Sequence, residues 1–414
     1  MAARTDAASS QAARSRRAWL RSPWTAAALV LLFYVLWLAA FFLTGHEARD
    51  AIYLGKPFVL QSHRSVVIQY DPTYHYVAND RQGYDGQYAY FIALDPANAR
   101  YNVDDAAYRY TRILYPLAAR LLALGQPALV PFTLLAVNLL AVTGGTLALA
   151  AWLRRKGVSP WLALLFGLSP GVCWAIQRDL TEPLGYALVA LGVYLFDFGG
   201  RRRVLWAGVA FGLAALARES TLIFPLVYGL ALAFAGRPHA LFTLARQRLA
   251  TNWRPTALLL GLAVGPFLAY KVFLLLWLGS LGTPASLTPV VVPFAGVLAH
   301  WPWGAEQDII VGTVIFPALV CAGLAIWALR RRLADAAIWA LLANVLLFVV
   351  MLNPRSYVLD GTVRITLGVT LAALLCVPAF DRLTRRNRGW LALCGALWLA
   401  TLPFWLTIPL TLRY

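Results

Sequence analysis

Charged residues are scarce in this chain of 414 residues, and acidic residues are the scarcest of them. Asp, Glu, Lys and Arg together make up 13% of the sequence, whereas a soluble domain carries about a quarter. Hydrophobic residues make up 60%, and the mean hydropathy is +0.65. The small charged fraction excludes an ordinary soluble domain, and the composition predicts a membrane protein with many spans.

Cysteine is rare, and several catalytic motifs are missing. The four cysteines lie within apolar runs and form neither a disulfide framework nor a CxxC metal pattern, so we expect small core residues. The sequence has no Walker A loop, GxGxxG fingerprint, HExxH or GxSxG motif. The sequence therefore lacks the common motifs for nucleotide binding and for acyl transfer through a serine. The cysteines are Cys173, Cys321, Cys376 and Cys394.

Apolar runs recur along the whole chain, and a spanning helix needs about 20 residues. We predict an all-α polytopic membrane protein with about eleven transmembrane helices, of which all but the first form a bundle over residues 127–414. The first span follows a basic tail (residues 1–23), and its apolar core is too long for a signal peptide, so we expect it to be retained. The expected spans are Trp24–Thr44, Pro127–Leu153, Pro160–Ile176, Leu184–Phe198, Val204–Ala217, Thr221–Ala235, Thr256–Gly279, Ile309–Leu329, Ala336–Leu352, Ile365–Phe380 and Trp390–Ile408.

The net charge of +18 follows a topological pattern. If the N-terminus is cytoplasmic, the arginine-rich connections all fall on the cytoplasmic side, as the positive-inside rule requires. The basic excess therefore indicates topology, and we expect no nucleic-acid partner. The arginine-rich segments include residues 1–23, Arg154–Lys156, Arg201–Arg203, Arg237–Arg254, Arg330–Arg332 and Arg382–Arg388.

The predicted outer face carries the one long hydrophilic loop, residues 45–126. Within it, Ile113–Leu124 is short and contains Arg120, so we predict an interfacial amphipathic helix. A second outer loop contains His300, Trp301 and Trp303, which either line a sugar site by stacking or anchor the chain at the membrane interface.

The segment Gly83–Pro96, GYDGQYAYFIALDP, is the most polar and aromatic part of the long loop. Glycines on either side of Tyr84 and Asp85 permit a close approach of a ligand to the backbone. One interpretation makes Asp85 a general base or metal ligand, with Tyr84, Gln87 and Tyr88 binding substrate. The other makes Asp85 the N-cap of an interfacial helix whose aromatic residues lie at the headgroups.

Two charged clusters lie at predicted outer ends of apolar spans, where charge is costly unless paired or functional. Arg178, Asp179 and Glu182 either bind substrate or close a helical hairpin as an ion pair, with Thr181 or Asp179 capping the next span. Arg218 and Glu219 offer the same choice.

Arginine suits the recognition of phosphate through paired hydrogen bonds, and Arg355 and Arg364 flank the last outer loop. They are phosphate-binding candidates and equally ordinary membrane anchors. Lys271, inside a predicted span, is expected to snorkel or to pair internally.

This layout resembles the GT-C superfamily of membrane glycosyltransferases, which share one span, a large outer loop with interfacial helices and an early aspartate, and then further spans. GYDGQYAYFIALDP and RYTRILYPLAARLLALG look like a bacterial group of cell-surface glycopolymer formation proteins. RDLTEPL and ALARESTLIFP look like later motifs of the same group. The resemblance covers residues 1–240, and the remainder is similar only in architecture.

The resemblance implies inverting transfer of a sugar from a polyprenyl-phosphate donor to a glycan, lipid or protein acceptor, on the outer face of a bacterial inner membrane. Asp85 would act as the general base, Glu182 would help to position the acceptor or a metal, and arginines would neutralise the leaving phosphate. The paired first-loop acids of protein mannosyltransferases are missing, since Asp104-Asp105 follows the aromatic stretch, so participation of a divalent metal ion stays open. The implied substrate-binding residues are Tyr84, Gln87, Tyr88, Arg178, Asp179, Arg218, Glu219, Arg355 and Arg364.

Two other functions stay open at this point. A flippase or exporter of lipid-linked glycans would carry charged residues along a path through the membrane, whereas the charges here gather on one predicted face. A glycan polymerase would depend on arginines more than on Asp85.

Overall fold

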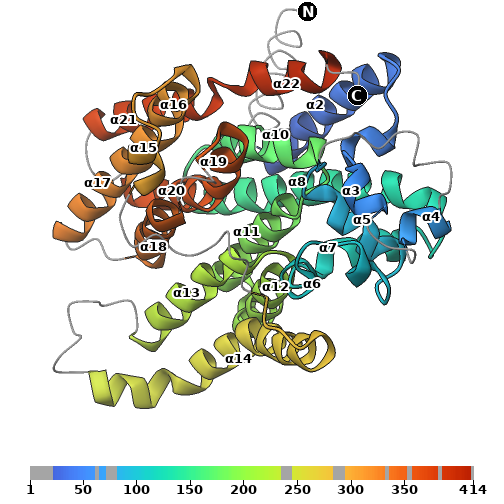
Figure 1. Cartoon of the computed structure of the whole chain (residues 1–414). Helices are drawn as coiled ribbons and strands as arrows, with labels where there is room; N and C mark the ends of the chain where they lie inside the picture. Colours follow the sequence, from blue (N-terminus) through green and yellow to red (C-terminus); the bar gives the residue numbers. More distant parts are fainter. Residues whose placement is uncertain are drawn as a thin grey trace, which may run out of the picture.

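The computed structural model describes residues 22–60, 65–70, 82–234, 245–282, 294–331, 335–351, 357–380 and 385–411. Within these ranges the regular elements are all helices, so the all-α prediction is confirmed for the described part of the chain (Figure 1). Most of the basic N-terminal tail, and Arg355, lie outside the described residues.

Six helical stretches are long and apolar enough to cross a membrane, or up to eight if each of two bent pairs counts as one span. These apolar helices support the prediction of a membrane protein, while their number, taken over the described residues, is below the eleven expected. The difference arises because several expected spans are short helices that meet at breaks. The six stretches are α2 (Pro23–Leu43), η4 with α8 (Pro127–Arg155), the apolar part of α14 (Asn252–Leu278), α16 to α17 (Ala305–Arg330), α19 to α20 (Leu359–Phe380) and α21 to α22 (Asn387–Thr407).

Both bent pairs lie between Pro160 and Ala217. In the first, Pro160–Gly167 meets α10 (Pro170–Gln177) at 47°. In the second, α11 (Glu182–Phe198) turns through 118° into Gly200–Ala217, and Gly200 takes a positive φ that glycine adopts without strain. These breaks shorten the helices, so each bent pair counts as one span at most.

The charged residues Arg218 and Glu219 lie between two helices, as predicted. α12 (Arg203–Ala217) ends just before Arg218, and η7 (Glu219–Leu222) leads into α13 (Ile223–Ala233). A single long helix would have placed both charges along a continuous apolar face. The break instead lets their side chains reach partners on other elements.

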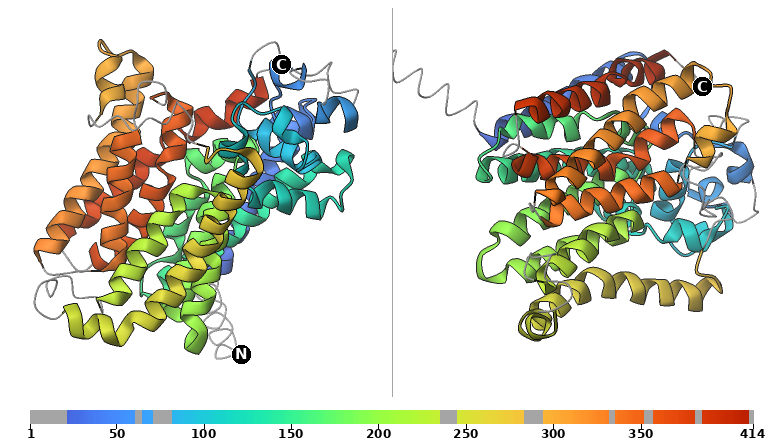
Figure 2. Two further views of the ribbon diagram at one scale, coloured as in Figure 1. Left: turned by 60° about the horizontal axis from the view of Figure 1, so that its bottom comes forward. Right: turned by 90° about the vertical axis from the view of Figure 1, so that its left-hand side faces the viewer.

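The long hydrophilic loop folds into short helices that gather at one end of the bundle (Figure 2). Their apolar faces form a second core that also includes Leu274 of α14 (Ala245–Leu278). The expected helix near residues 113–124 is present as α7. These helices are η1 (Ala48–Ala51), α3 (Lys56–Leu60), α4 (Val66–Tyr70), α5 (Gly86–Leu94), η3 (Ala99–Tyr101), α6 (Ala106–Tyr110) and α7 (Leu114–Leu122).

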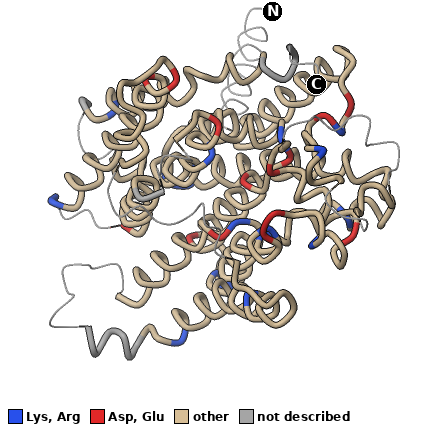
Figure 3. The backbone as a smooth tube through the Cα atoms, viewed as in Figure 1, with Lys and Arg blue, Asp and Glu red and all other residues tan. Residues whose placement is uncertain are grey.

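The bundle itself consists of two packed groups. In the first, α8 (Val130–Arg155) packs on α2 and α11, and α12 packs on α11 and α14. In the second, α18 (Ala336–Met351) packs on α17 (Phe316–Arg330) and α20 (Leu367–Phe380). The groups meet where α10 packs on α19 (Leu359–Ile365) and α13 on α18. Figure 3 shows acidic and basic positions grouped near the first of these junctions.

Candidate functional site

Asp85 lies at the start of α5, but it does not cap that helix. Its backbone occupies the N-cap position, yet its side chain makes no capping hydrogen bond. The carboxylate instead accepts hydrogen bonds from Arg109 (Oδ1–Nη1, 3.0 Å) and from Arg364 (Oδ2 to Nη1 and Nη2, both 3.1 Å). The geometry therefore rejects the capping interpretation and leaves Asp85 available for chemistry.

Arg109 is held in place by two neighbours, Asp104 and Tyr88. Asp104 accepts from its Nε and Nη2 in a paired arrangement, both at 2.7 Å, while the ring of Tyr88 lies 3.9 Å from the guanidinium carbon. A paired carboxylate and a stacked ring leave a guanidinium little freedom of orientation. Arg109 thus presents one fixed nitrogen, Nη1, to Asp85.

Arg364, on α19, joins Asp85 to a buried glutamate on α11. Its Nε donates to Glu182 Oε1 at 2.7 Å, and Arg218 Nη1 lies 2.9 Å from the same oxygen. The Glu182 side chain is 0% exposed, whereas that of Asp85 is 34% exposed. A buried carboxylate requires such pairing, because an unpaired charge in the interior is costly. Glu182 is therefore the inner anchor of the site, and Asp85 its accessible carboxylate.

Tyr84 connects three helices at the same place. Its hydroxyl accepts from Trp174 Nε1 and from Arg364 Nη1, each at 3.0 Å, and donates to Asp360 Oδ2 at 2.7 Å. Because Tyr84 leads into α5 and its partners lie on α10 and α19, it positions Arg364 relative to Asp85.

A further ion pair lies beside this network. Arg112 donates to Glu219 through Nε (3.0 Å) and Nη2 (2.6 Å), and Nη2 also reaches the Tyr108 hydroxyl at 2.6 Å. Glu219 is therefore engaged across the break between α12 and α13 and holds Arg112 beside the pocket.

A pocket opens beside Asp85. Three guanidinium groups line it, those of Arg109, Arg112 and Arg364, together with the carboxyl groups of Asp85, Asp179 and Glu182. Three buried oxygens of the lining residues have no hydrogen-bond partner among the described residues: Asp179 Oδ2, Thr181 Oγ1 and Glu182 Oε2. Unsatisfied buried polar atoms are rare and costly, so these oxygens mark places where a ligand's polar groups would bind. The lining residues are Asp85, Tyr88, Ala89, Ile92, Arg109, Arg112, Pro116, Asp179, Leu180, Thr181, Glu182 and Arg364.

The pKa values of the two aspartates of the pocket shift in opposite directions. Burial acts to raise the pKa of Asp85, but the guanidinium groups of Arg364, Arg109 and Arg112 outweigh it and hold that pKa well below its usual range. Burial raises the pKa of Asp179 well above its usual range, although Tyr115 donates to its Oδ1 at 3.3 Å. The arginines thus favour the ionised form of Asp85, whereas burial disfavours the ionised form of Asp179.

Most of the sequence-predicted site residues meet here. Asp85, Tyr88, Asp179, Glu182 and Arg364 line the pocket, and Tyr84, Arg218 and Glu219 bind residues that line it. Two predicted binding residues, Gln87 and Arg178, contact other parts of the loop instead, and Arg355 lies outside the described residues.

Gln87 and Arg178 brace the loop rather than line the pocket. The Gln87 amide accepts from Gly55 N (3.0 Å) and donates to the Gln82 carbonyl (2.8 Å). The guanidinium of Arg178 lies over the rings of Tyr53 and Trp174, at 4.7 and 4.6 Å. Both residues join the segment before α5 to neighbouring elements.

The remaining candidates lie away from the pocket. Lys271 donates to Thr111 Oγ1 at 3.1 Å and to the Leu281 carbonyl, so its internal pairing is confirmed. His300 packs on Tyr357 with ring centroids 5.5 Å apart, and Trp301 is 71% exposed.

Sequence reasoning missed Arg109 and Arg112 as site residues. A signal was present in YRYTR, where two arginines three residues apart alternate with tyrosines. Asp104, the partner of Arg109, enters the sequence analysis only as part of the Asp104-Asp105 pair that follows the aromatic stretch.

The carboxylates of the site do not fit a divalent metal ion. Both oxygens of Asp85 and Oε1 of Glu182 are occupied by guanidinium groups, which leaves only Glu182 Oε2 among these four oxygens for a cation. Over the described residues, no group of three or more His, Cys, Asp or Glu is placed to hold a metal ion. The site is built for anions.

Gly86 is required by the close approach of α5 to the Arg178–Asp179 turn. A methyl group at Gly86 would overlap the Arg178 carbonyl oxygen, which belongs to the backbone and cannot rotate away. We expect Gly86→Ala to lower the melting temperature by several degrees and to displace Asp85. In Gly144→Ala, a matched helical control with open space, stability should stay equal or rise. Thermal unfolding of both variants in detergent measures this difference; equal melting temperatures would contradict it.

No protein-family model matches this sequence, and no curated protein or solved structure matches it.

Proposed function

We propose that this protein is a membrane glycosyltransferase that moves a sugar from a polyprenyl-phosphate donor to a glycan, lipid or protein acceptor. The observation that carries the proposal is a partly exposed carboxylate, Asp85, on the wall of a pocket lined by three arginines. A general base beside several guanidinium groups suits a reaction in which a hydroxyl attacks and a phosphate leaves. The resemblance of GYDGQYAYFIALDP to GT-C enzymes supports the same function.

The proposed step uses two parts of the pocket. The acceptor hydroxyl oxygen forms a bond to the anomeric carbon of the sugar, and its proton passes to Asp85. The bond between that carbon and the phosphate oxygen breaks, so polyprenyl phosphate leaves with an additional negative charge. Arg109, Arg112 and Arg364 are placed to neutralise that charge. The partnerless oxygens of Asp179, Thr181 and Glu182 suit hydrogen bonds from sugar hydroxyls.

The ion pairs of Asp85 make donor binding a condition for base catalysis. In the described state both carboxylate oxygens accept hydrogen bonds from arginines, so the carboxylate is a weak base. A donor phosphate competes for Arg109 and Arg364, which releases Asp85 and raises its pKa. We therefore expect ordered binding, in which the donor binds before the acceptor.

We further propose the finer topology expected from the sequence. The N-terminus would be cytoplasmic, about eleven segments would cross a bacterial inner membrane, and the pocket would open toward the outer face. The positive-inside distribution of arginines supports this orientation.

The test is an assay of purified protein in lipid vesicles with synthetic polyprenyl-phosphate sugars and membrane-extracted acceptors. We expect release of polyprenyl phosphate together with transfer of labelled sugar to the acceptor. A carrier would instead move the intact lipid-linked sugar across the vesicle membrane without releasing polyprenyl phosphate. That outcome would replace the transferase by the flippase alternative.

A further inference from the structure

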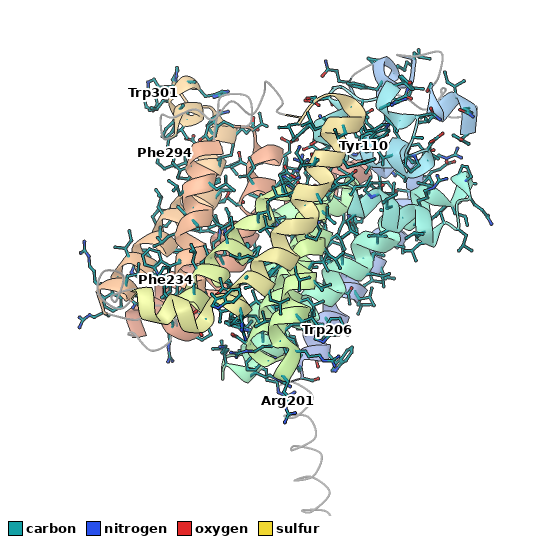
Figure 4. All side chains as sticks on the ribbon, turned by 90° about the horizontal axis from the view of Figure 1, so that it is seen from below. Tyr110, Arg201, Trp206, Phe234, Phe294 and Trp301 are labelled. Carbon is teal, nitrogen blue, oxygen red and sulfur yellow. The ribbon has the colours of Figure 1, made fainter. Side chains whose placement is uncertain are left out.

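A second pocket lies far from the candidate site, at the other end of α11. Glu182 begins α11 and Asp197 lies in its last turn, about 22 Å away along the helix at 1.5 Å per residue. Figure 4 shows Arg201 and Phe234, which follow α11 and α13, at the end of the molecule opposite Tyr110 and Trp301. The pocket lies among the ends of α8, α11, α12, α13 and α18 and has about 780 Å³ of empty space.

The lining of this pocket combines charge with aromatic surface. Trp152, Phe196 and Tyr228 supply the aromatic part, of which Trp152 and Tyr228 are buried. Four charged residues complete the lining: Lys156, Arg203, Asp197 and Asp335.

The charged residues are organised rather than scattered. Lys156 Nζ lies 2.7 Å from Asp197 Oδ2, and the Trp152 indole donates to the same oxygen at 2.8 Å. The ammonium of Lys156 also lies 5.2 Å from the centre of the Trp152 ring. Asp335 is exposed and uses Oδ1 to accept from the Ala337 backbone at the start of α18. The pocket therefore offers two cations and two carboxylates, with no net charge.

A ligand that complements this lining carries an anion and a cation close together. An anionic group alone would face Asp197 and Asp335, and a cationic group alone would face Lys156 and Arg203. A phosphate joined to a primary amine satisfies both pairs, because the phosphate accepts from the two cations and the ammonium donates to carboxylate. The pocket also lies at the ends of apolar helices, where the headgroups of a lipid leaflet are found.

We propose that this pocket binds the phosphoethanolamine group of a phospholipid. Lys156 and Arg203 hold the phosphate, Asp335 holds the ammonium, and Trp152 keeps Asp197 aligned with Lys156. The acyl chains run alongside the apolar helices that frame the pocket. The site is independent of the glycosyltransferase proposal, since it shares no lining residue with the pocket beside Asp85.

The test measures thermal stabilisation of the full chain in detergent by short-chain phospholipids. Phosphatidylethanolamine should raise the melting temperature at concentrations at least 10-fold lower than phosphatidylcholine or phosphatidylglycerol. Free phosphoethanolamine should need at least 100-fold more, because it lacks the acyl chains; equal potency would identify a soluble ligand and overturn the lipid assignment. Equal stabilisation by phosphatidylglycerol or phosphatidylcholine would overturn the pairing of ammonium with carboxylate.

Variants separate specific binding from general lipid effects. Lys156→Ala with Arg203→Ala should weaken the response to phosphatidylethanolamine at least 10-fold. Arg201→Ala, a control for an exposed arginine outside the lining, should leave it unchanged. If the double variant fails to fold, Asp335→Asn, an exposed and milder change, should remove the preference for phosphatidylethanolamine over phosphatidylglycerol. A retained preference in Asp335→Asn would overturn the proposal.

Discussion

Asp85→Asn is expected to reduce sugar transfer by about 10²-fold or more, while the protein folds to normal levels. The amide keeps the size of the carboxylate and one acceptor for Arg364 or Arg109, but it cannot take the acceptor's proton. General acid–base catalysis contributes about 10²–10⁴ in rate, and this sets the expected loss. The measurement is the initial rate of polyprenyl-phosphate release by purified protein.

The matched control for this prediction is Asp95→Asn. Asp95 lies in the same loop at the end of α5, where its carboxylate binds Ala97, Asn98 and Tyr70 away from the pocket. Its substitution should leave the rate within about two-fold, since surface changes of this kind have small effects. Full activity in Asp85→Asn would exclude the base role and favour a polymerase or carrier that depends on the arginines.

The native protein and Asp85→Asn should also differ in how their stability depends on pH. The pKa of Asp85 is lowered in the folded protein, so its ionised form stabilises the fold above the unfolded pKa of about 3.9. This contribution is lost as the pH falls through the lower, folded pKa. The difference in melting temperature between the native protein and Asp85→Asn should therefore be constant above about pH 5 and shrink below pH 4. A difference that grew on acidification would contradict the ion pairs.

Arg364→Ala is expected to remove both activity and a large part of the stability. The substitution leaves Glu182 with Arg218 alone, Asp85 with Arg109 alone, and Tyr84 without one of its donors. Removing one partner of a buried ion pair costs about 3 kcal/mol, and losing one charge-stabilising donor costs about 10²-fold in rate. Thermal unfolding and the release assay measure the two effects.

Arg364→Lys separates charge from geometry at this position. An ammonium keeps the positive charge, but one nitrogen cannot bind Asp85, Glu182 and Tyr84 in the directions that a guanidinium reaches. Lysine should restore more of the stability than of the activity. Arg331→Ala, on an exposed arginine that lies over Trp327, serves as the control and should change neither. Normal activity in Arg364→Ala would show that the network around Glu182 is dispensable.

The sequence predicted the helical class of this protein and the importance of a few charged residues. A long apolar run is stable in lipid once its backbone hydrogen bonds are made within a helix, so the helices can be predicted from the sequence without knowing the fold. Asp85 and Glu182 stood out for a related reason, because carboxylates beside apolar runs are costly unless they are paired or in use. The number of spans was harder to predict, because the bend between α11 and α12 turns two apolar runs into one broken element.

Which arginine pairs with which carboxylate depends on the packing of the helices. Arg109 lies 24 residues beyond Asp85 and Arg364 lies 279 residues beyond it, and the chain contains many other arginines with equal charge. Coulombic attraction does not distinguish one arginine from another. These groups come within bonding distance only because α5 packs against the Arg178–Asp179 turn and α19 packs against α10. The apolar composition implies that the few charged groups must pair with one another, whereas the packing of the helices sets which groups pair.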